Sequence, residues 1–263
     1  MADIRELMNK FGKLMVKAGA TVGRKVADTY RKIDPDVMRH LSQTPLLVYS
    51  LFVSRREKID PGEPDGYLPL IFVHGLGGSR GNFLLMSWYL WLAGRKRSYK
   101  IHFTEGQSID DMATALARFI RDVKKATGEK RVEIIAHSLG GIIARLAISK
   151  HRLASSVKTL ITLGTPHRGT YFARYANTKI TRDLRPDSEL MKRLNKRPWP
   201  KNIRGVSFWS RNDLLVLPAE SAAMEGTEQV EVTPFTHYSY LIDPKSWAAV
   251  EKALMGKSRR TKK

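Results

Sequence analysis

Apolar residues follow two different periods along the chain, and the alternation of these periods predicts a layered α/β fold. Short apolar runs typical of buried strands occupy residues 68–73, 99–103, 132–135, 157–163, 205–210 and 229–233. Apolar residues recur every three or four positions, as in amphipathic helices, over residues 82–91, 109–127, 142–148 and 248–255. Strands that alternate with helices in this way form a mostly parallel sheet with helices on both faces.

Two segments fall outside this alternation and predict additions to the main domain. Residues 1–66 combine a basic, amphipathic helical pattern with the turn-rich stretch 60–66, and residues 170–203 mix aromatic with basic side chains. We therefore expect an N-terminal helical extension and linker over 1–66, a main domain over 67–256 with a small helical cap at about 170–203, and a basic tail over 257–263. The extension fits either a membrane interface or packing on the domain, and the cap fits either a lipid-facing lid or a solvated insertion.

The positive charge of the chain favours anionic partners. Lysine and arginine number 46 against 25 acidic residues, a formal net charge of +21, and residues 167–205 alone carry eleven basic and three acidic residues. No zinc-finger spacing, RNP-like aromatic motif or basic region with heptads is present, so nucleic acid is not the expected partner. An anionic membrane surface is the alternative. The oligomeric state cannot be read from this pattern.

Targeting signals bear on where the protein works. The N-terminal residues lack the apolar core of a secretory signal, and the longest apolar run, residues 45–53, is about half of the roughly 20 residues that a bilayer needs. We therefore expect a cytoplasmic protein, peripheral at the inner membrane face if it binds lipid. There are no cysteines, so thiolate metal sites are excluded, and no metal or cofactor is expected.

Candidate chemistry is centred on Ser138. The apolar strand 132–135 passes into the helix 142–148 through Ala136-His-Ser-Leu-Gly140, a pattern in which small residues flank a serine at two positions on either side. Such a turn lifts the hydroxyl clear of the sheet and leaves the Leu139 N–H beside it. A strand–loop–helix joint with an incidental serine is the alternative.

An acid and a histidine follow Ser138 in a definite order. Asp213 comes directly after the strand 205–210, and His237 follows the strand 229–233. Serine, acid and histidine occur in this order in α/β hydrolases. His237 would accept the Ser138 proton and Asp213 would orient the imidazole. Asp183, Asp187 and Asp243 compete for the role of the acid, and His167 for that of the base.

The glycine-rich stretch His74-Gly-Leu-Gly-Gly78 follows the first strand of the domain and supplies the second predicted oxyanion donor, the Leu76 N–H. A phosphate-binding loop is the alternative, but the G-x-x-x-x-G-K-[ST] spacing is absent. Four positions near these motifs are predicted to contact substrate: His74, Gly75, His137 and His167.

These motifs resemble those of bacterial lipases and esterases of the α/β-hydrolase superfamily. Val73-His-Gly-Leu-Gly-Gly78 looks like their oxyanion loop, and Ala136-His-Ser-Leu-Gly140 is similar to the elbow of small Bacillus-type lipases. Gly164-Thr-Pro-His-Arg-Gly169 is similar to a segment of Pseudomonas-type lipases and inositol-deacylase-like relatives. The resemblance covers roughly residues 68–255 and implies an α/β-hydrolase fold.

The expected function is hydrolysis of carboxylic esters through an acyl-enzyme on Ser138, with an acyl ester or lipid as substrate. A thioesterase or a phospholipase would use the same residues. A lipid-surface or nucleic-acid-binding protein that keeps the fold without catalysis is the alternative from another class.

Overall fold

The structure, a computed structural model, describes residues 59–256. The predicted N-terminal extension lies almost wholly outside the described residues, as does its amphipathic helix, and the basic tail lies entirely outside them.

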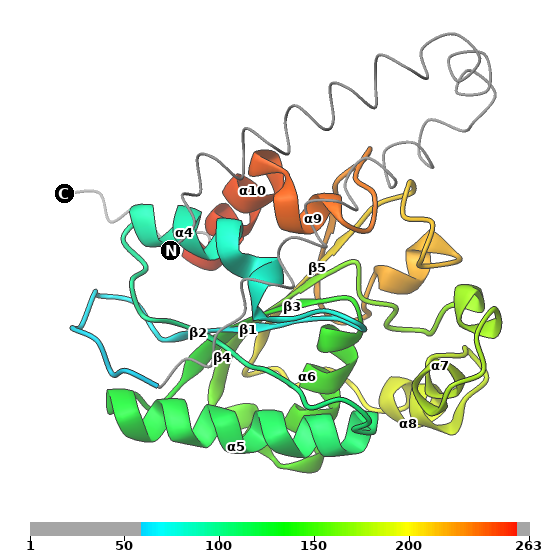
Figure 1. Ribbon diagram of the computed structural model, residues 1–263, viewed down its shortest axis with the longest axis horizontal. Helices are drawn as coiled ribbons and strands as arrows, with labels where there is room; N and C mark the ends of the chain where they lie inside the picture. The colour runs from blue at the N-terminus through cyan, green and yellow to red at the C-terminus, as the bar shows by residue number, and fades with distance from the viewer. Residues whose placement is uncertain (1–58, 257–263) are drawn as a thin grey trace, which may run out of the picture. The chain divides into compact units, whose positions relative to one another are not determined.

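Six strands form one sheet in the order β2-β1-β3-β4-β5-β6, and every neighbouring pair is parallel (Figure 1). The strands are β1 (Leu70–Val73), β2 (Ser98–Lys100), β3 (Val132–His137), β4 (Val157–Leu163), β5 (Arg204–Trp209) and β6 (Glu228–Glu231). The prediction of a mostly parallel α/β sheet is therefore confirmed. Because all strands run the same way, their carboxyl ends meet at one edge of the sheet.

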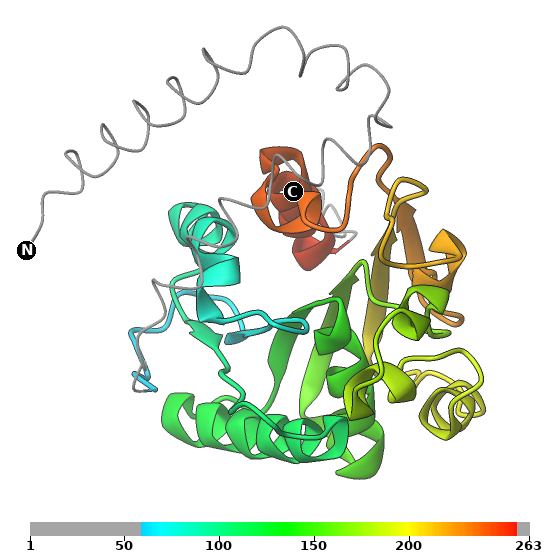
Figure 2. The same cartoon turned by 45° about the vertical axis from the view of Figure 1, so that its right-hand side comes forward.

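Helices cover both faces of the sheet (Figure 2). On one face α4 (Leu84–Leu92), α9 (Ser239–Ile242) and α10 (Pro244–Met255) pack against side chains such as Leu70 and Phe72. On the other face α5 (Ile109–Thr127) and α6 (Leu139–Lys150) pack against Ile71 and Val73. Successive residues of β1 thus serve opposite cores, which explains why its sequence is apolar throughout.

Helix boundaries follow local capping chemistry. The Ser108 hydroxyl accepts a hydrogen bond from the Asp111 N–H at 3.1 Å, and Gly128 adopts a left-handed conformation at the other end of α5, as the sequence predicts. The helix predicted over residues 82–91 does not begin at Asn82. Ser79 caps the 3-10 helix η1 (Arg80–Phe83), and the Asn82 side chain instead accepts a hydrogen bond from the Ser79 N–H at 2.6 Å. Among residues 59–256, no helix has both the length and the apolarity to cross a bilayer.

The segment between β4 and β5 lies outside the sheet. It contains η3 (Tyr171–Arg174), α7 (Lys179–Asp183) and α8 (Glu189–Asn195), and it corresponds to the predicted cap. Two further 3-10 turns, η2 (Leu153–Ser155) and η4 (Ala219–Ala222), lie in loops. Figure 1 shows α7 and α8 to the right of α6, outside the sheet.

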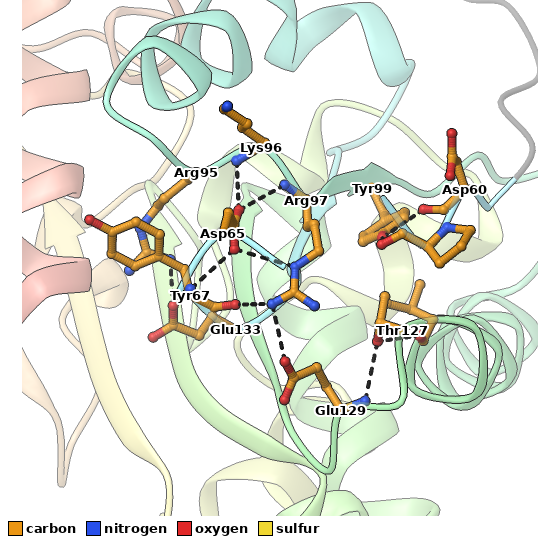
Figure 3. A network of polar contacts seen from close by, with 12 residues as sticks. Asp60, Asp65, Tyr67, Arg95, Lys96, Arg97, Tyr99, Thr127, Glu129 and Glu133 are labelled. Atoms are coloured by element: carbon orange, nitrogen blue, oxygen red, sulfur yellow. Dashed lines mark hydrogen bonds and ion pairs between the residues drawn. The ribbon is translucent and has the colours of Figure 1, made fainter. Parts of the chain in front are cut away.

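A polar network fastens the first described residues to the edge of the sheet (Figure 3). The Asp65 carboxylate accepts hydrogen bonds from the N–H groups of Lys96 and Arg97 at 2.7 and 3.1 Å. The Arg97 guanidinium lies 3.3 Å from Asp65 and 3.1 Å from Glu129, and the Tyr99 hydroxyl donates to the Asp60 carbonyl oxygen at 2.8 Å. These contacts cover the outer strand β2, which otherwise would present an open edge.

Burial of the Asp65 side chain disfavours its charged form, but hydrogen bonds from the main-chain N–H groups of Arg97, Tyr67 and Lys96 outweigh burial and lower its pKa below the ordinary value of 3.8. An acid whose pKa is lowered on folding stabilises the protein above its unfolded pKa. This contribution is lost as the pH falls through the folded pKa.

We predict that Asp65→Asn lowers the free energy of unfolding at pH 7 by on the order of 2 kcal/mol, because charge-assisted hydrogen bonds are weakened. The difference from the wild type should shrink below about pH 4 as the wild-type carboxylate takes up a proton. Urea unfolding at pH 7, 5 and 3 measures both effects. Asp60→Asn is the control, since within residues 59–256 the Asp60 carboxylate accepts a hydrogen bond from the exposed Gly62 N–H alone. An equal loss in both variants, or a loss independent of pH, would contradict the prediction.

Candidate active site

Ser138 stands alone at the tip of a strained turn between β3 and α6. Its φ and ψ angles are 54° and −126°, and within residues 59–256 only Arg152 is another non-glycine residue with positive φ. The Ser138 N–H donates to the Leu163 carbonyl oxygen at 2.9 Å, which ties the turn to the end of β4. Such strain in a residue other than glycine is kept where the surrounding structure enforces it, and it concentrates at functional sites.

Two glycines allow the backbone around Ser138 to pack closely. A Cβ atom at Gly140 would lie 2.4 Å from the Val73 carbonyl oxygen and 2.7 Å from that of His74, so only glycine lets the first turn of α6 meet the end of β1. A Cβ atom at Gly75 would lie 2.8 Å from the Ser138 Cβ. The glycine-rich loop after β1 therefore lies directly against the serine.

His237 and Asp213 form a buried pair. The His237 Nδ1 atom lies 2.8 Å from one Asp213 carboxylate oxygen and 3.0 Å from the other. The Asp213 Oδ1 atom also accepts hydrogen bonds from the N–H groups of Leu215 and Val216 at 3.0 and 3.2 Å. Because a carboxylate only accepts, Nδ1 carries the proton, and the Nε2 atom of a neutral His237 is left as a base.

The tautomers of two other buried histidines follow from the same reasoning. His137 donates through Nε2 to the main-chain oxygen of His237 at 2.8 Å, and the two rings lie 4.7 Å apart. His74 donates through Nδ1 to the Gly75 carbonyl oxygen at 3.0 Å. Burial lowers the pKa of His74 to about 4 and that of His137 well below its ordinary value. Both rings are therefore neutral near pH 7, and both brace the main chain around the site.

His167 is buried and does not line the cavity that Ser138 and His237 line. Its Nε2 atom lies 2.9 Å from the Thr162 hydroxyl, and its Nδ1 atom lies 3.4 Å from the Arg145 guanidinium. Burial, then the Arg145 charge, lowers the pKa of His167 well below its ordinary value. A neutral ring bonded on both sides does not suit a catalytic base.

Arg145 joins α6 to the cap. From the buried face of α6 it donates to the His167 carbonyl oxygen at 3.0 Å, the Leu194 carbonyl oxygen at 3.1 Å and the Asn195 Oδ1 atom at 3.0 Å. Leu194 and Asn195 lie in the last turn of α8, whose carbonyl groups lack helical partners. Burial lowers the pKa of Arg145 to about 10, so the guanidinium remains charged at neutral pH.

A cavity of about 540 Å³ opens at the carboxyl edge of the sheet, a size suited to a small organic ligand. Ser138 and His237 both line it, whereas Asp213 lies behind His237 and does not. The rest of its wall comes from the glycine-rich loop, the cap and the acid loop: Gly75, Leu76, Gly77, Gly78, Asn82, His137, Pro166, Thr170, Phe172, Ala173, Tyr175, Ala176, Thr181, Leu184, Leu215, Val216 and Tyr238. Among residues 59–256, no lysine, arginine, aspartate or glutamate lines it, so its described wall suits an uncharged ligand.

The other predicted site residues differ in their relation to this cavity. Leu76, Gly75 and His137 line it, while His74 and His167 do not, and their placement speaks against direct contact with a substrate. Leu76 lies in a turn closed by a 3.1 Å hydrogen bond from the Gly78 N–H to the Gly75 oxygen. Leu139 is the first residue of α6, so its N–H has no acceptor within the helix.

Among residues 59–256, no group of three or more His, Asp or Glu side chains is arranged to hold a metal ion.

The sequence analysis did not identify the main-chain donors to Asp213, the buried Arg145 or the full set of cap residues that line the cavity. The main-chain bonds from Leu215 and Val216 to Asp213 follow from the tendency of aspartate to bond N–H groups two and three residues ahead, and that signal was available. Arg145 interrupts the apolar run 142–148, which also marks it for a buried partner. The cap residues that line the cavity carry no comparable signal.

Known proteins similar to this chain share its motifs and its fold. The family model described as "PGAP1-like alpha/beta domain" matches residues 96–243, more than half of the chain. A triacylglycerol lipase of Pseudarthrobacter phenanthrenivorans is 31% identical over 124 residues, which is 44% of this chain and 38% of the lipase. A GPI inositol-deacylase of Candida albicans is 26% identical over 156 residues, 45% of this chain and 39% of the deacylase. The chain thus spans well under half the length of these curated relatives.

Solved structures agree on the fold. The mature lipase BlEst2 of Bacillus licheniformis superimposes with a TM-score of 0.61 at 18% identity, over 75% of this chain and 96% of that one. These matches confirm the predicted resemblance to lipase- and esterase-like α/β hydrolases. The chain belongs to the PGAP1-like alpha/beta domain family and has the α/β-hydrolase fold.

Proposed function

We propose that this protein is a serine hydrolase that cleaves carboxylic esters through a triad of Ser138, His237 and Asp213. The observation that carries the proposal is the 2.8 Å contact between His237 Nδ1 and Asp213, at the wall of an uncharged cavity that Ser138 also lines. The strained turn at Ser138 supports it, because that turn directs the serine into the same cavity.

Acyl transfer begins with the base. The Nε2 atom of His237 takes the hydroxyl proton as the Ser138 Oγ atom attacks the ester carbonyl carbon, and the carbonyl oxygen becomes an oxyanion. The N–H groups of Leu76 and Leu139 are the proposed donors to this oxyanion. Asp213 stabilises the imidazolium without taking the proton, since two main-chain N–H groups and the ring hold its negative charge in place.

The tetrahedral intermediate collapses when the bond from carbon to the leaving oxygen breaks and His237 protonates that oxygen. The alcohol departs and the acyl group stays on Ser138 as an ester. A water molecule then gives its proton to His237 and attacks the acyl carbon, and the second collapse returns the proton to Ser138 and releases the carboxylic acid.

An acyl lipid or another acyl ester is the proposed substrate. The uncharged wall with Phe172, Leu184 and Val216 favours an apolar acyl chain. Relatives named as a triacylglycerol lipase and a GPI inositol-deacylase support an ester of a lipid or of an inositol. A thioesterase or a phospholipase would use the same groups, and a p-nitrophenyl ester panel from C2 to C16 beside acyl thioesters and phospholipids separates these cases. No hydrolysis of any of them would favour a non-catalytic role for the fold.

We predict that Ser138→Ala and His237→Ala each lower kcat on the best panel ester by at least about ten-thousand-fold, because the two groups act as one unit. The double variant should be no worse than either single one. Circular dichroism and thermal unfolding establish that each variant is folded. Near-normal turnover in a folded single variant would exclude this mechanism.

Asp213→Asn should lower kcat by about ten-thousand-fold, since an amide that donates to Nδ1 would fix His237 in the wrong tautomer. Asp187→Asn is the matched control, because Asp187 lies on the cap and competed with Asp213 in the sequence. We expect the control to retain most of the wild-type activity. The opposite result, an active Asp213→Asn and an inactive Asp187→Asn, would move the acid to Asp187.

The proposal extends to peripheral attachment at an anionic membrane, such as the cytoplasmic face of a bacterial membrane. Leu76, Phe172 and Tyr175 line the cavity and are 54%, 41% and 85% exposed, so an apolar rim surrounds its mouth. The cap that carries two of them is basic, with eleven lysine and arginine residues over 167–205. Each cation near an anionic surface adds on the order of 1 kcal/mol of attraction.

We predict stronger sedimentation with phosphatidylglycerol vesicles than with phosphatidylcholine vesicles, and weaker binding at 1 M salt, where the Debye length falls to about 3 Å. Tyr175→Ser should reduce vesicle binding, because it removes an exposed aromatic side chain from the mouth of the cavity. Deletion of residues 1–30 measures how much the N-terminal extension contributes to vesicle binding. Equal binding to both lipids at every salt concentration would show that the positive charge has no membrane role.

A further inference from the structure

A second cavity, of about 460 Å³, lies between α5, α6 and α8 at the end of α6 remote from Ser138. Its wall includes Leu146 and Leu194, which are 3% and 4% exposed. Its charged groups are Lys150, Arg152, Arg193, Arg197 and the carboxylate of Asp110. This charged wall contrasts with the uncharged wall of the cavity beside Ser138.

Three guanidinium groups of this cavity have no partner in the described part of the chain. Within residues 59–256, no hydrogen bond or ion pair joins the side chains of Arg152, Arg193 or Arg197 to another group. Arg152 also adopts the left-handed conformation, with φ 52° and ψ 43°, which a long side chain rarely does. The fold therefore brings three arginines from two separate segments to one concave surface without supplying anions for them.

The other two charges of the wall, on Lys150 and Asp110, cancel each other. Lys150 forms an ion pair with Asp110, so four cations and one carboxylate leave a formal excess of three positive charges. Like charges held together destabilise a folded protein unless an anion joins them. A single carboxylate would neutralise one of the three, whereas a phosphoryl group brings up to two charges and three acceptor oxygens.

We propose that this cavity is a binding site for the phosphoryl group of a small ligand, held by the guanidinium groups of Arg152, Arg193 and Arg197. Planar guanidinium donors match phosphoryl oxygens in pairs, and the apolar surface of Leu146 and Leu194 accommodates a carbon portion of the ligand. The volume suits a phosphate monoester larger than the inorganic ion. The site uses neither Ser138 nor the other triad residues, so it is independent of the proposed hydrolysis.

The phosphoryl group can come from a soluble phosphate ester or from a lipid headgroup. Calorimetric titration of the full chain with inorganic pyrophosphate and with sn-glycerol 3-phosphate tests the soluble source. Vesicles containing phosphatidic acid test the lipid source, compared with phosphatidylglycerol vesicles of the same surface potential. The comparison separates a phosphate monoester from general attraction to negative charge.

The test variant is Arg193→Gln with Arg197→Gln, two exposed positions at which substitution leaves the core intact. The matched control is Lys192→Gln with Lys196→Gln, which removes the same charge from the same part of the cap but outside the cavity. Asp110→Asn is a third variant, expected to strengthen anion binding. It removes the one carboxylate among the described residues of the wall and frees Lys150.

We expect the test variant to lose at least about tenfold in affinity for pyrophosphate, glycerol phosphate or phosphatidic acid, because two charge-assisted contacts are removed. The control should lose less than about threefold, and Asp110→Asn should bind more tightly than the wild type. Binding of pyrophosphate or glycerol phosphate identifies a soluble ligand, and binding of phosphatidic acid alone identifies a lipid. An equal loss in test variant and control, or no binding by the wild type, would overturn the proposal.

Discussion

The close approach of α6 to the end of β1 is the constraint on which the candidate site depends. Gly140 allows the first helical turn to rest on the carbonyl groups of Val73 and His74, and no residue with a side chain fits there without displacing backbone. This contact fixes Ser138 in a sparsely populated backbone conformation, which costs on the order of 1–3 kcal/mol for a residue other than glycine. It also sets the glycine-rich loop against the serine, so one steric constraint positions Ser138 and the loop together.

Electrostatics divides the molecule into zones with different chemistry. Around Ser138, burial keeps His137 of the wall uncharged, and Asp213 behind the wall is held by its bonds to His237 and to main-chain N–H groups. At the other end of α6, cations face one another across a cavity with one carboxylate between them. A single helix thus links a site suited to an uncharged acyl group with a surface suited to an anion.

The sequence predicted what local periodicity and spacing determine. The sheet, the helices on both faces and the positions of Ser138, Asp213 and His237 at strand ends all follow from apolar runs and turn formers.

Other features depend on tertiary contacts. Ser79 rather than Asn82 begins η1, because Asn82 can complete the capping box from its third position. The strand predicted over residues 99–103 is shorter in the structure, where β2 spans Ser98–Lys100 and pairs with β1. His74 and His167 were predicted at the substrate because they flank conspicuous motifs, but their rings turn into the interior, where packing and not motif position decides orientation.

The two hydrogen bonds from Arg145 to α8 restrict how the cap can move. Displacing α8 would strip a buried guanidinium of the Leu194 and Asn195 oxygens, and leaving a buried charge without its partner costs several kcal/mol. The part of the cap from η3 to α7 has no such bond to α6. Its aromatic side chains, Tyr175 above all, are largely in contact with solvent. If the mouth of the cavity beside Ser138 widens, we therefore expect residues 171–183 to move and α8 to stay in place.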